Sequence, residues 1–138
     1  MSPWRFIAYH PKGAGCPIRD WYNAQHPKVR AAFEFTVGIL KGTDVWIGTR
    51  EFKELEGEHL GLAEVRFNVE FPKPGSPSGQ VKRRFRPLGV WRPREREFVF
   101  LVGYEKSGRM WLPPNAFKLA FRFKREFELG MGEVNDYL

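Results

Sequence analysis

The pair Glu64 and Arg66 has the types and the spacing of residues that handle phosphate chemistry. They lie two positions apart in residues 62–71, where polar and apolar side chains alternate as in a β-strand with one buried face. In such a strand both side chains share the polar face, roughly 6.5–7 Å apart, so they can flank one phosphate group. An ordinary salt bridge on a solvated strand face has the same spacing, and this interpretation stays open.

The positive charge of the chain is concentrated in one segment. The net charge is +7, from 23 Lys and Arg against 16 Asp and Glu. Between residues 82 and 96 the basic side chains face a single acid, Glu95, and all but one are arginines, which bind phosphate in a bidentate manner. This favours RNA or DNA as the partner, with a solubilising surface as the alternative. The basic residues are Lys82, Arg83, Arg84, Arg86, Arg92, Arg94 and Arg96.

The hydrophobic pattern predicts four strands. The last of them is a continuous apolar run, FVFLVGY, so we expect it to be the most buried. Residues 72–79, rich in proline and glycine, predict a hairpin tip, and Pro87 and Gly89 predict a break or bulge in the strand that follows. The strands are expected over residues 4–9, 62–71, 80–91 and 98–104.

Three helices complete the predicted fold. They are expected over residues 18–25, 27–41 and 115–128, where apolar residues recur at helical spacing or a proline opens the segment. The order β-α-α-β-β-β-α predicts an α+β fold with a mostly antiparallel four-stranded sheet and the helices packed on one face.

Length and composition exclude several classes of protein. A chain of 138 residues predicts one domain, residues 1–138. One cysteine, Cys16, and three histidines at irregular spacing exclude a disulfide framework and a zinc site, so no metal or cofactor is expected. Because no segment resembles a signal peptide or a membrane span, we expect a soluble, cytoplasmic protein without a membrane partner.

Four short motifs stand in order between residues 52 and 128. They are a Lys-x-Leu, a Leu-x-Glu-aliphatic-Arg, an aromatic-Arg pair, and a strand ending in an aromatic and a lysine ahead of a proline and an alanine-bearing helix. The residues are Lys53, Leu55, Leu62, Glu64, Val65, Arg66, Phe85, Arg86, Tyr104, Lys106, Pro113 or Pro114, Ala116 and Ala120. In this order the motifs resemble those of the RelE/HigB-type toxin superfamily, in particular its phage-derived branch.

The resemblance implies a RelE-like fold and the toxin of a type II toxin–antitoxin system. Active members of the family cleave messenger RNA without a metal, mostly on the ribosome, so mRNA, the ribosome and an adjacently encoded helix-turn-helix antitoxin are the expected partners. The implied reaction is attack of the ribose 2′-hydroxyl on the adjacent phosphate, which gives a cyclic phosphate and a free 5′-hydroxyl.

The resemblance also assigns roles to residues. Arg66 and Arg86 are expected to clamp the phosphate, with Lys106 closing the site. Glu64 or Lys53 is the candidate base, and a lysine in this role requires burial or cationic neighbours. The charge pattern, and not the resemblance, predicts the residues that hold nucleic acid, which are Lys82, Arg83, Arg84, Arg92, Arg94 and Arg109.

Two further interpretations stay open. One is a catalytically silent, phage-derived module that binds RNA or a partner, which the replacement of a family lysine by Glu105 favours. The other is an interaction protein with an acidic protein partner. The general acid is not assigned: the family often uses a tyrosine or histidine late in the chain, and only Tyr137 lies there.

Overall fold

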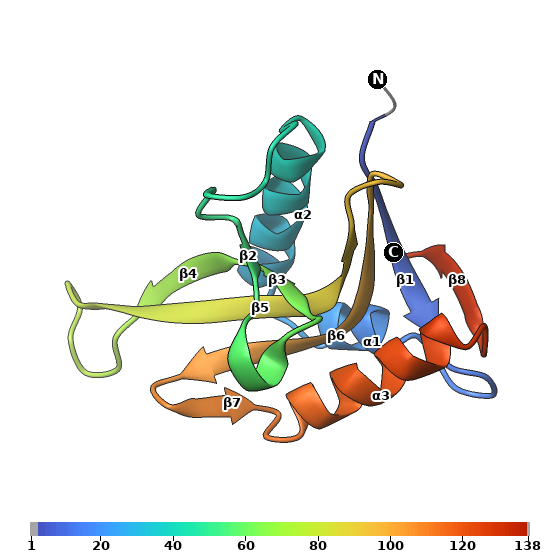
Figure 1. Cartoon of the computed structure of the whole chain (residues 1–138). Helices are drawn as coiled ribbons and strands as arrows, with labels where there is room; N and C mark the ends of the chain where they lie inside the picture. The colour runs from blue at the N-terminus through green and yellow to red at the C-terminus, as the bar shows by residue number, and fades with distance from the viewer. Residues whose placement is uncertain (1–2, 138) are drawn as a thin grey trace.

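The computed structural model describes residues 3–137, which form three α-helices, one 3₁₀ turn and eight β-strands (Figure 1). The predicted helices and strands are present in the predicted order. The elements are β1 (Arg5–His10), α1 (Pro17–Asn23), α2 (Pro27–Lys41), β2 (Phe52–Glu54), η1 (Gly57–His59), β3 (Ala63–Val65), β4 (Phe67–Pro72), β5 (Gln80–Arg92), β6 (Glu97–Ser107), β7 (Met110–Leu112), α3 (Ala116–Glu128) and β8 (Glu133–Asp136).

The strands form one mixed sheet in the order β2-β3-β5-β6-β1-β8, with β4 also beside β5 and β7 beside β6. The pair β1–β6 is parallel, and the other pairs are antiparallel. The α+β class is therefore confirmed, but the sheet has eight strands where four were predicted. The added strands β2, β7 and β8 have three or four residues each, too few for a periodic pattern to reveal them.

Helices cover both faces of the sheet, so the prediction of helices on one face was wrong. Phe98 and Phe100 of β6 pack in one core with residues of α1 and α2, whereas Val99 and Leu101 pack in a second core with residues of α3. The continuous apolar run of β6 explains this arrangement, because a strand with two apolar faces needs cover on each. All residues from Glu97 to Tyr104 are buried, which confirms β6 as the most buried strand.

A β-bulge divides β6 into two halves. The pair Leu88–Val102 is followed directly by Gly89–Phe100, which leaves Leu101 without a partner on β5. An extra residue reverses the alternation of side chains, so Leu101 and Val102 both pack in the core beneath α3. The predicted irregularity near Gly89 is confirmed, but its extra residue lies in the neighbouring strand.

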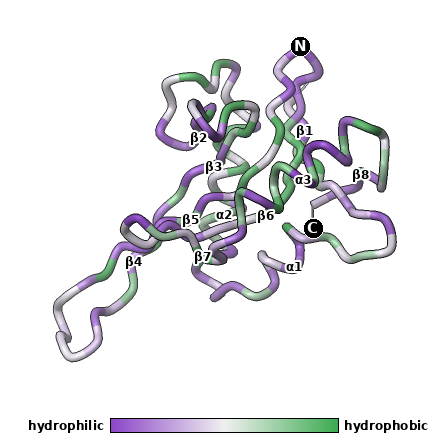
Figure 2. The backbone as a smooth tube through the Cα atoms, turned by 60° about the horizontal axis from the view of Figure 1, so that its bottom comes forward, coloured by the Kyte–Doolittle hydropathy of each residue, from purple (hydrophilic) through white to green (hydrophobic). Residues whose placement is uncertain are grey.

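The strands β4 and β5 extend from the body as a two-stranded arm (Figures 1 and 2). Residues 73–79 form its tip, as predicted, and the amide of Lys73 donates to the carbonyl of Gly79 at 2.9 Å. β3 and β4 share one register against β5 but are interrupted at Arg66. The shared register places Val65 opposite Pro87, directly before the interruption. Pro87 has no N–H to donate to the neighbouring strand.

Candidate functional site

The register of β3, β4, β5 and β6 brings the predicted cluster together. Arg86 lies opposite Tyr104, and the shared register of β3 and β4 places Arg66 opposite Arg86. Glu64 pairs with Leu88 one row away. Directly opposed residues lie on the same face of a sheet, here the face that carries α3. Glu64, Arg66 and Arg86 are thus neighbours on one face, as the sequence predicted.

Glu64 is buried, and both of its carboxylate oxygens are engaged. The hydroxyl of Tyr104 donates to Oε2 at 2.8 Å, and Nε of Arg66 lies 3.2 Å from Oε1. Glu64 is 4% exposed, whereas the Arg66 side chain is 34% exposed. Burial, followed by the charge of Glu64, raises the pKa of the Tyr104 hydroxyl far above its ordinary value. The phenol therefore keeps its proton and serves as a hydrogen-bond donor that fixes the carboxylate.

The guanidinium of Arg86 is held by backbone carbonyls. Its Nη1 donates to the carbonyl of Phe85 at 2.8 Å and to that of Phe67 at 3.1 Å, and Asn68 Oδ1 lies at 3.4 Å. Burial, with the nearby charge of Arg66, lowers the pKa of Arg86 from its ordinary value. Its Nε is buried without a hydrogen-bond partner. A buried donor of this kind is costly unless an acceptor completes it.

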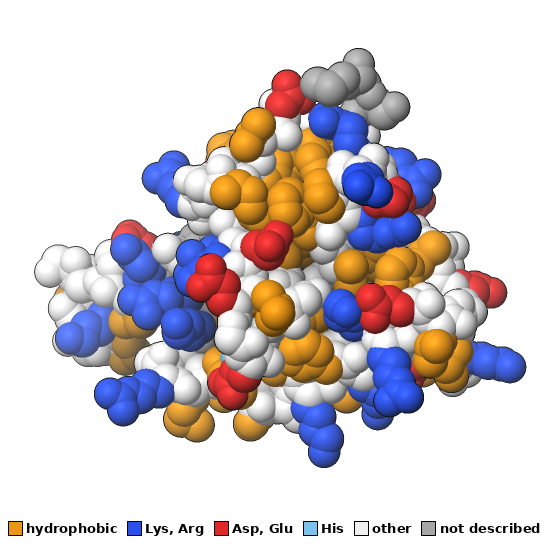
Figure 3. Space-filling model, viewed as in Figure 1, with side chains coloured by type: hydrophobic (Ala, Val, Ile, Leu, Met, Phe, Trp, Pro, Cys, Tyr) orange, Lys and Arg blue, Asp and Glu red, His pale blue; other side chains and the backbone are white. Residues whose placement is uncertain are grey.

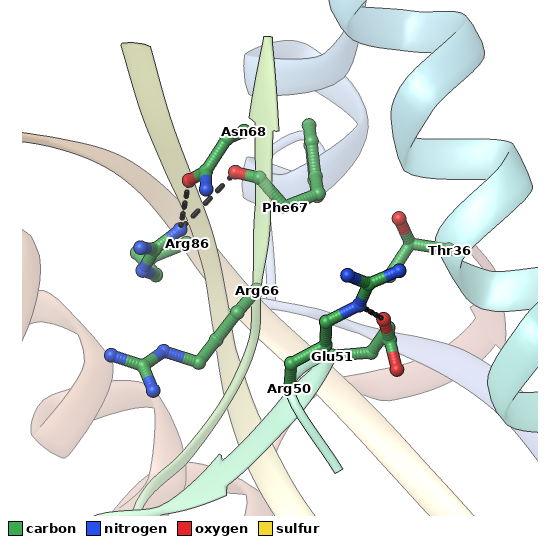
Figure 4. A pocket seen from close by; sticks show the side chains of 7 residues that line it. All are labelled: Thr36, Arg50, Glu51, Arg66, Phe67, Asn68 and Arg86. Carbon is green, nitrogen blue, oxygen red and sulfur yellow. Dashed lines mark hydrogen bonds and ion pairs between the residues drawn. The ribbon is translucent and has the colours of Figure 1, made fainter. Parts of the chain in front are cut away.

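A cleft of about 480 Å³ opens beside these arginines. In Figure 4 the guanidinium groups of Arg66 and Arg86 extend to the same side of β4, whereas Arg50 lies toward α2. The Nε of Arg66 is also buried, and the group closest to it is the carboxylate of Glu64 at 3.2 Å. Three arginines and one carboxylate suit the cleft to an anion. Its lining residues are Thr36, Arg50, Glu51, Arg66, Phe67, Asn68 and Arg86.

Lys53 and Lys106 are the exposed members of the predicted catalytic set. Lys53 of β2 lies opposite Glu64, and Lys106 of β6 lies opposite Arg84. By the same rule of opposed residues, both lysines stand on the face of Glu64 and Arg86. The structure thus places all five predicted catalytic residues on one face.

Tyr104 is the member of this cluster that sequence reasoning did not assign to the site. Counting alternate residues from Phe98 and Phe100 puts Tyr104 on the same face as these two residues, which is the face opposite to Glu64. The bulge at Leu101 reverses the count, so Tyr104 packs in the core beneath α3 and reaches Glu64. No feature of the sequence locates the extra residue in β6.

Four cations on and beside the arm form what we call the basic face: Lys82 and Arg84 of β5, Lys106 of β6, and the partly exposed Arg66 between β3 and β4. Lys82 and Arg84 of β5 are exposed and, by alternation along the strand, lie on the side of Arg86. Glu70 lies opposite Lys82 and offsets part of the charge. Figure 3 shows Lys and Arg side chains gathered over the arm.

The other predicted nucleic-acid residues lie elsewhere. Arg83 points to the face of Phe85, where Glu105 binds it in a bidentate manner at 2.6 and 2.7 Å and raises its pKa. Arg92, near the far end of β5, pairs with Glu97 at 2.6 Å. The remaining two are exposed in turns, Arg94 between β5 and β6 and Arg109 between β6 and β7.

Tyr137 does not belong to this site. Its ring packs against Phe33 and Phe100 on the face of α1 and α2, and its hydroxyl donates to Glu34 at 2.7 Å. The central sheet therefore separates Tyr137 from Glu64, which removes it as the acid of a reaction at Arg66 and Arg86.

Comparison of the chain with models of known protein families, with characterised proteins and with solved structures gave no match. Within residues 3–137, no group of three or more His, Cys, Asp or Glu side chains could hold a metal ion. In the same part of the chain we find no helix with the length and hydropathy needed to cross a bilayer.

Proposed function

We propose that the chain is a metal-independent endoribonuclease, the toxin of a type II toxin–antitoxin pair, as its resemblance to RelE/HigB-type toxins implies. The supporting observation is the pair Arg66 and Arg86. They line one cleft together with Arg50, and the Nε of Arg86 is buried without a hydrogen-bond acceptor. A phosphate of the RNA backbone would pair with the guanidinium groups that line the cleft, and the basic face would hold the rest of the strand.

Each group takes one part of the reaction. The 2′-hydroxyl loses its proton to a base, its oxygen bonds to the adjacent phosphorus, and the bond to the 5′-oxygen breaks as that oxygen gains a proton. Arg66 and Arg86 stabilise the extra negative charge of the pentavalent transition state. Because both oxygens of Glu64 are engaged, we assign it the orientation of Arg66. Lys106, which has the cationic neighbour Arg84, is then the candidate base, whereas Lys53 is exposed and lies opposite Glu64.

Expression of the chain alone tests this function. We expect growth arrest, and purified protein should yield RNA products with 2′,3′-cyclic phosphate and 5′-hydroxyl ends, with or without ribosomes and in the presence of a chelator. Arg66→Lys should relieve the arrest, because it keeps a cation beside Glu64 but loses the planar fork. Normal growth at high expression of folded protein, together with intact RNA, would reject the proposal.

Binding without cleavage is the second candidate, and the burial of Glu64 at 4% and Arg86 at 6% favours it. In this case the face holds RNA, but substrate does not reach a carboxylate base. The affinity should fall as salt rises, by about 0.7 log units per phosphate contact for each tenfold increase. Cleavage products would distinguish the first candidate from the second.

A further inference from the structure

One row of side chains crosses four strands of the sheet next to the cleft. Asn68 of β4 lies opposite Arg84 of β5, Arg84 opposite Lys106 of β6, and Lys106 opposite Trp111 of β7. Opposed residues share a face, and neighbouring strands lie about 4.8 Å apart, so the row is about 14 Å long. It runs beside the row of Arg66, Arg86 and Tyr104.

Trp111 ends this row as a partly exposed ring on a fixed aromatic support. Its ring centroid lies 4.6 Å from that of Phe117, and His59 meets it at 5.4 Å. His59 in turn stacks on Phe117 at 3.7 Å with an angle of 7° between the rings. The ring of Trp111 is thus held in place before any ligand binds, which reduces the entropic cost of stacking against it.

We propose that Trp111 is a base-stacking platform for single-stranded RNA, with the phosphates of that strand following Lys106 and Arg84 toward the cleft of Arg66 and Arg86. This inference rests on the proposed RNA binding and adds the form of RNA. The base faces of a duplex are covered by their neighbours, whereas those of a single strand can stack on an aromatic side chain. Lys106 lies one strand away from Trp111 and Arg84 two strands away, about 5 and 10 Å. At these distances the phosphates of a strand can contact both cations while one of its bases stacks on Trp111.

The test is binding of three labelled probes by fluorescence anisotropy. The probes are a 2′-O-methyl oligouridylate, which cannot be cleaved, the same strand with abasic residues, and an RNA duplex with the same number of phosphates. The protein should bind the intact strand at least about fivefold more tightly than the abasic strand or the duplex. Trp111→Leu should remove this difference in affinity and keep the salt dependence. Trp111→Phe should keep much of the difference, because its ring can still stack on a base.

Met110→Ala is the matched control, because Met110 is exposed on β7 and, as a direct neighbour of Trp111, faces the other side of the sheet. Equal affinity of the unmodified protein for intact and abasic strands would overturn the inference, and so would discrimination that survives in a folded Trp111→Leu protein. In either case binding itself would leave the proposed function standing. Failure to bind any probe at low salt would instead reject the proposed function.

Discussion

The hydroxyl of Tyr104 on β6 donates to the carboxylate of Glu64 on β3 at 2.8 Å, across the intervening strand β5. The two side chains are 3% and 4% exposed. The other carboxylate oxygen holds Arg66. The hydrogen bond therefore joins the most buried strand to the side chain that sets the position of a cation in the cleft.

Tyr104→Phe should lower the free energy of unfolding by about 1–3 kcal/mol, because it leaves a buried carboxylate oxygen without its donor. RNA cleavage should fall as well, since Arg66 loses a fixed partner. Denaturant unfolding and a cleavage assay measure the two effects. Tyr137→Phe is the control: its partner Glu34 is exposed and lies on the other face, so cleavage should not change. A Tyr104→Phe protein as stable and active as the original would contradict this role.

Replacing Arg66 and Arg86 by lysine should separate stability from function. Arg66→Lys should change the stability by less than about 1 kcal/mol, because Arg66 is one-third exposed and the charge beside Glu64 remains. Arg86→Lys should be more destabilising, since Arg86 is buried and a lysine Nζ does not take the position from which Nη1 bonds the carbonyls of Phe67 and Phe85. Both should reduce cleavage at least about tenfold. Equal stability of the two variants would show that Arg86 is not anchored as described.

Neutral variants of the basic face should lower the salt dependence of RNA binding. Lys82→Gln, Arg84→Gln and Lys106→Gln should each reduce the slope of log affinity against log salt by about 0.7, the value for one phosphate contact on a single strand. Arg94→Gln, in the turn at the far end of β5, should leave the slope unchanged. Titrations at several salt concentrations give the slopes, and an effect of Arg94→Gln as large as that of Arg84→Gln would place the RNA elsewhere.

Two glycines should respond to alanine in opposite ways. A Cβ at Gly103 would lie 2.2 Å from the indole ring of Trp21, so Gly103→Ala should destabilise the protein by about 1–3 kcal/mol or more. A Cβ at Gly38, exposed on α2, would meet no atom within 4 Å, so Gly38→Ala should stabilise the protein by about 0.5–1 kcal/mol. Denaturant unfolding of both variants checks the prediction, and a stable Gly103→Ala protein would show that α1 does not pack on β6 at this point.

Stability should fall as the pH rises from about 10 to about 12. Burial and the hydrogen bond to Glu126 raise the pKa of Tyr9 from 10.0 to about 12. Between pH 10 and pH 12 Tyr9 loses its proton in the unfolded chain but keeps it in the folded protein. Because the folded state then binds more protons than the unfolded state, the free energy of unfolding falls as the pH rises. Unfolding of Tyr9→Phe across the same range should show a smaller decline. Equal declines would mean that Tyr9 does not contribute.

The long elements could be predicted from the sequence, because their signals are local. Alternation in residues 62–71 predicted β3, which carries Glu64, and β4, which follows Arg66, and the proline- and glycine-rich segment 72–79 predicted the tip of the arm. The sharing of a face by Glu64 and Arg66 follows from that alternation alone. The short strands β2, β7 and β8 could not be predicted, since three or four residues form strands only when a neighbouring strand accepts them.

The rest of the site depends on pairing between distant residues. Trp111 lies beside Lys106 only through the register of β6 and β7, and Tyr104 reaches Glu64 only through the register of β6, β5 and β3. The charge of the segment from residue 82 to 96 was visible in the sequence, but its division between the basic face and ion pairs such as Arg83–Glu105 was not. Ion pairs of this kind depend on the register of two strands, which composition does not contain.

The bulge at Leu101 makes the length of β6 a constraint on the evolution of this protein. One residue gained or lost between Phe100 and Tyr104 would exchange the faces of everything beyond it, moving Lys106 off the basic face and turning Glu105 onto it. Substitutions in this strand can accumulate one at a time, whereas a change of length moves several residues of the proposed site together. Homologues that share the site should therefore keep a constant number of residues between Phe100 and Lys106, while the tip of the arm, residues 73–79, varies freely in length.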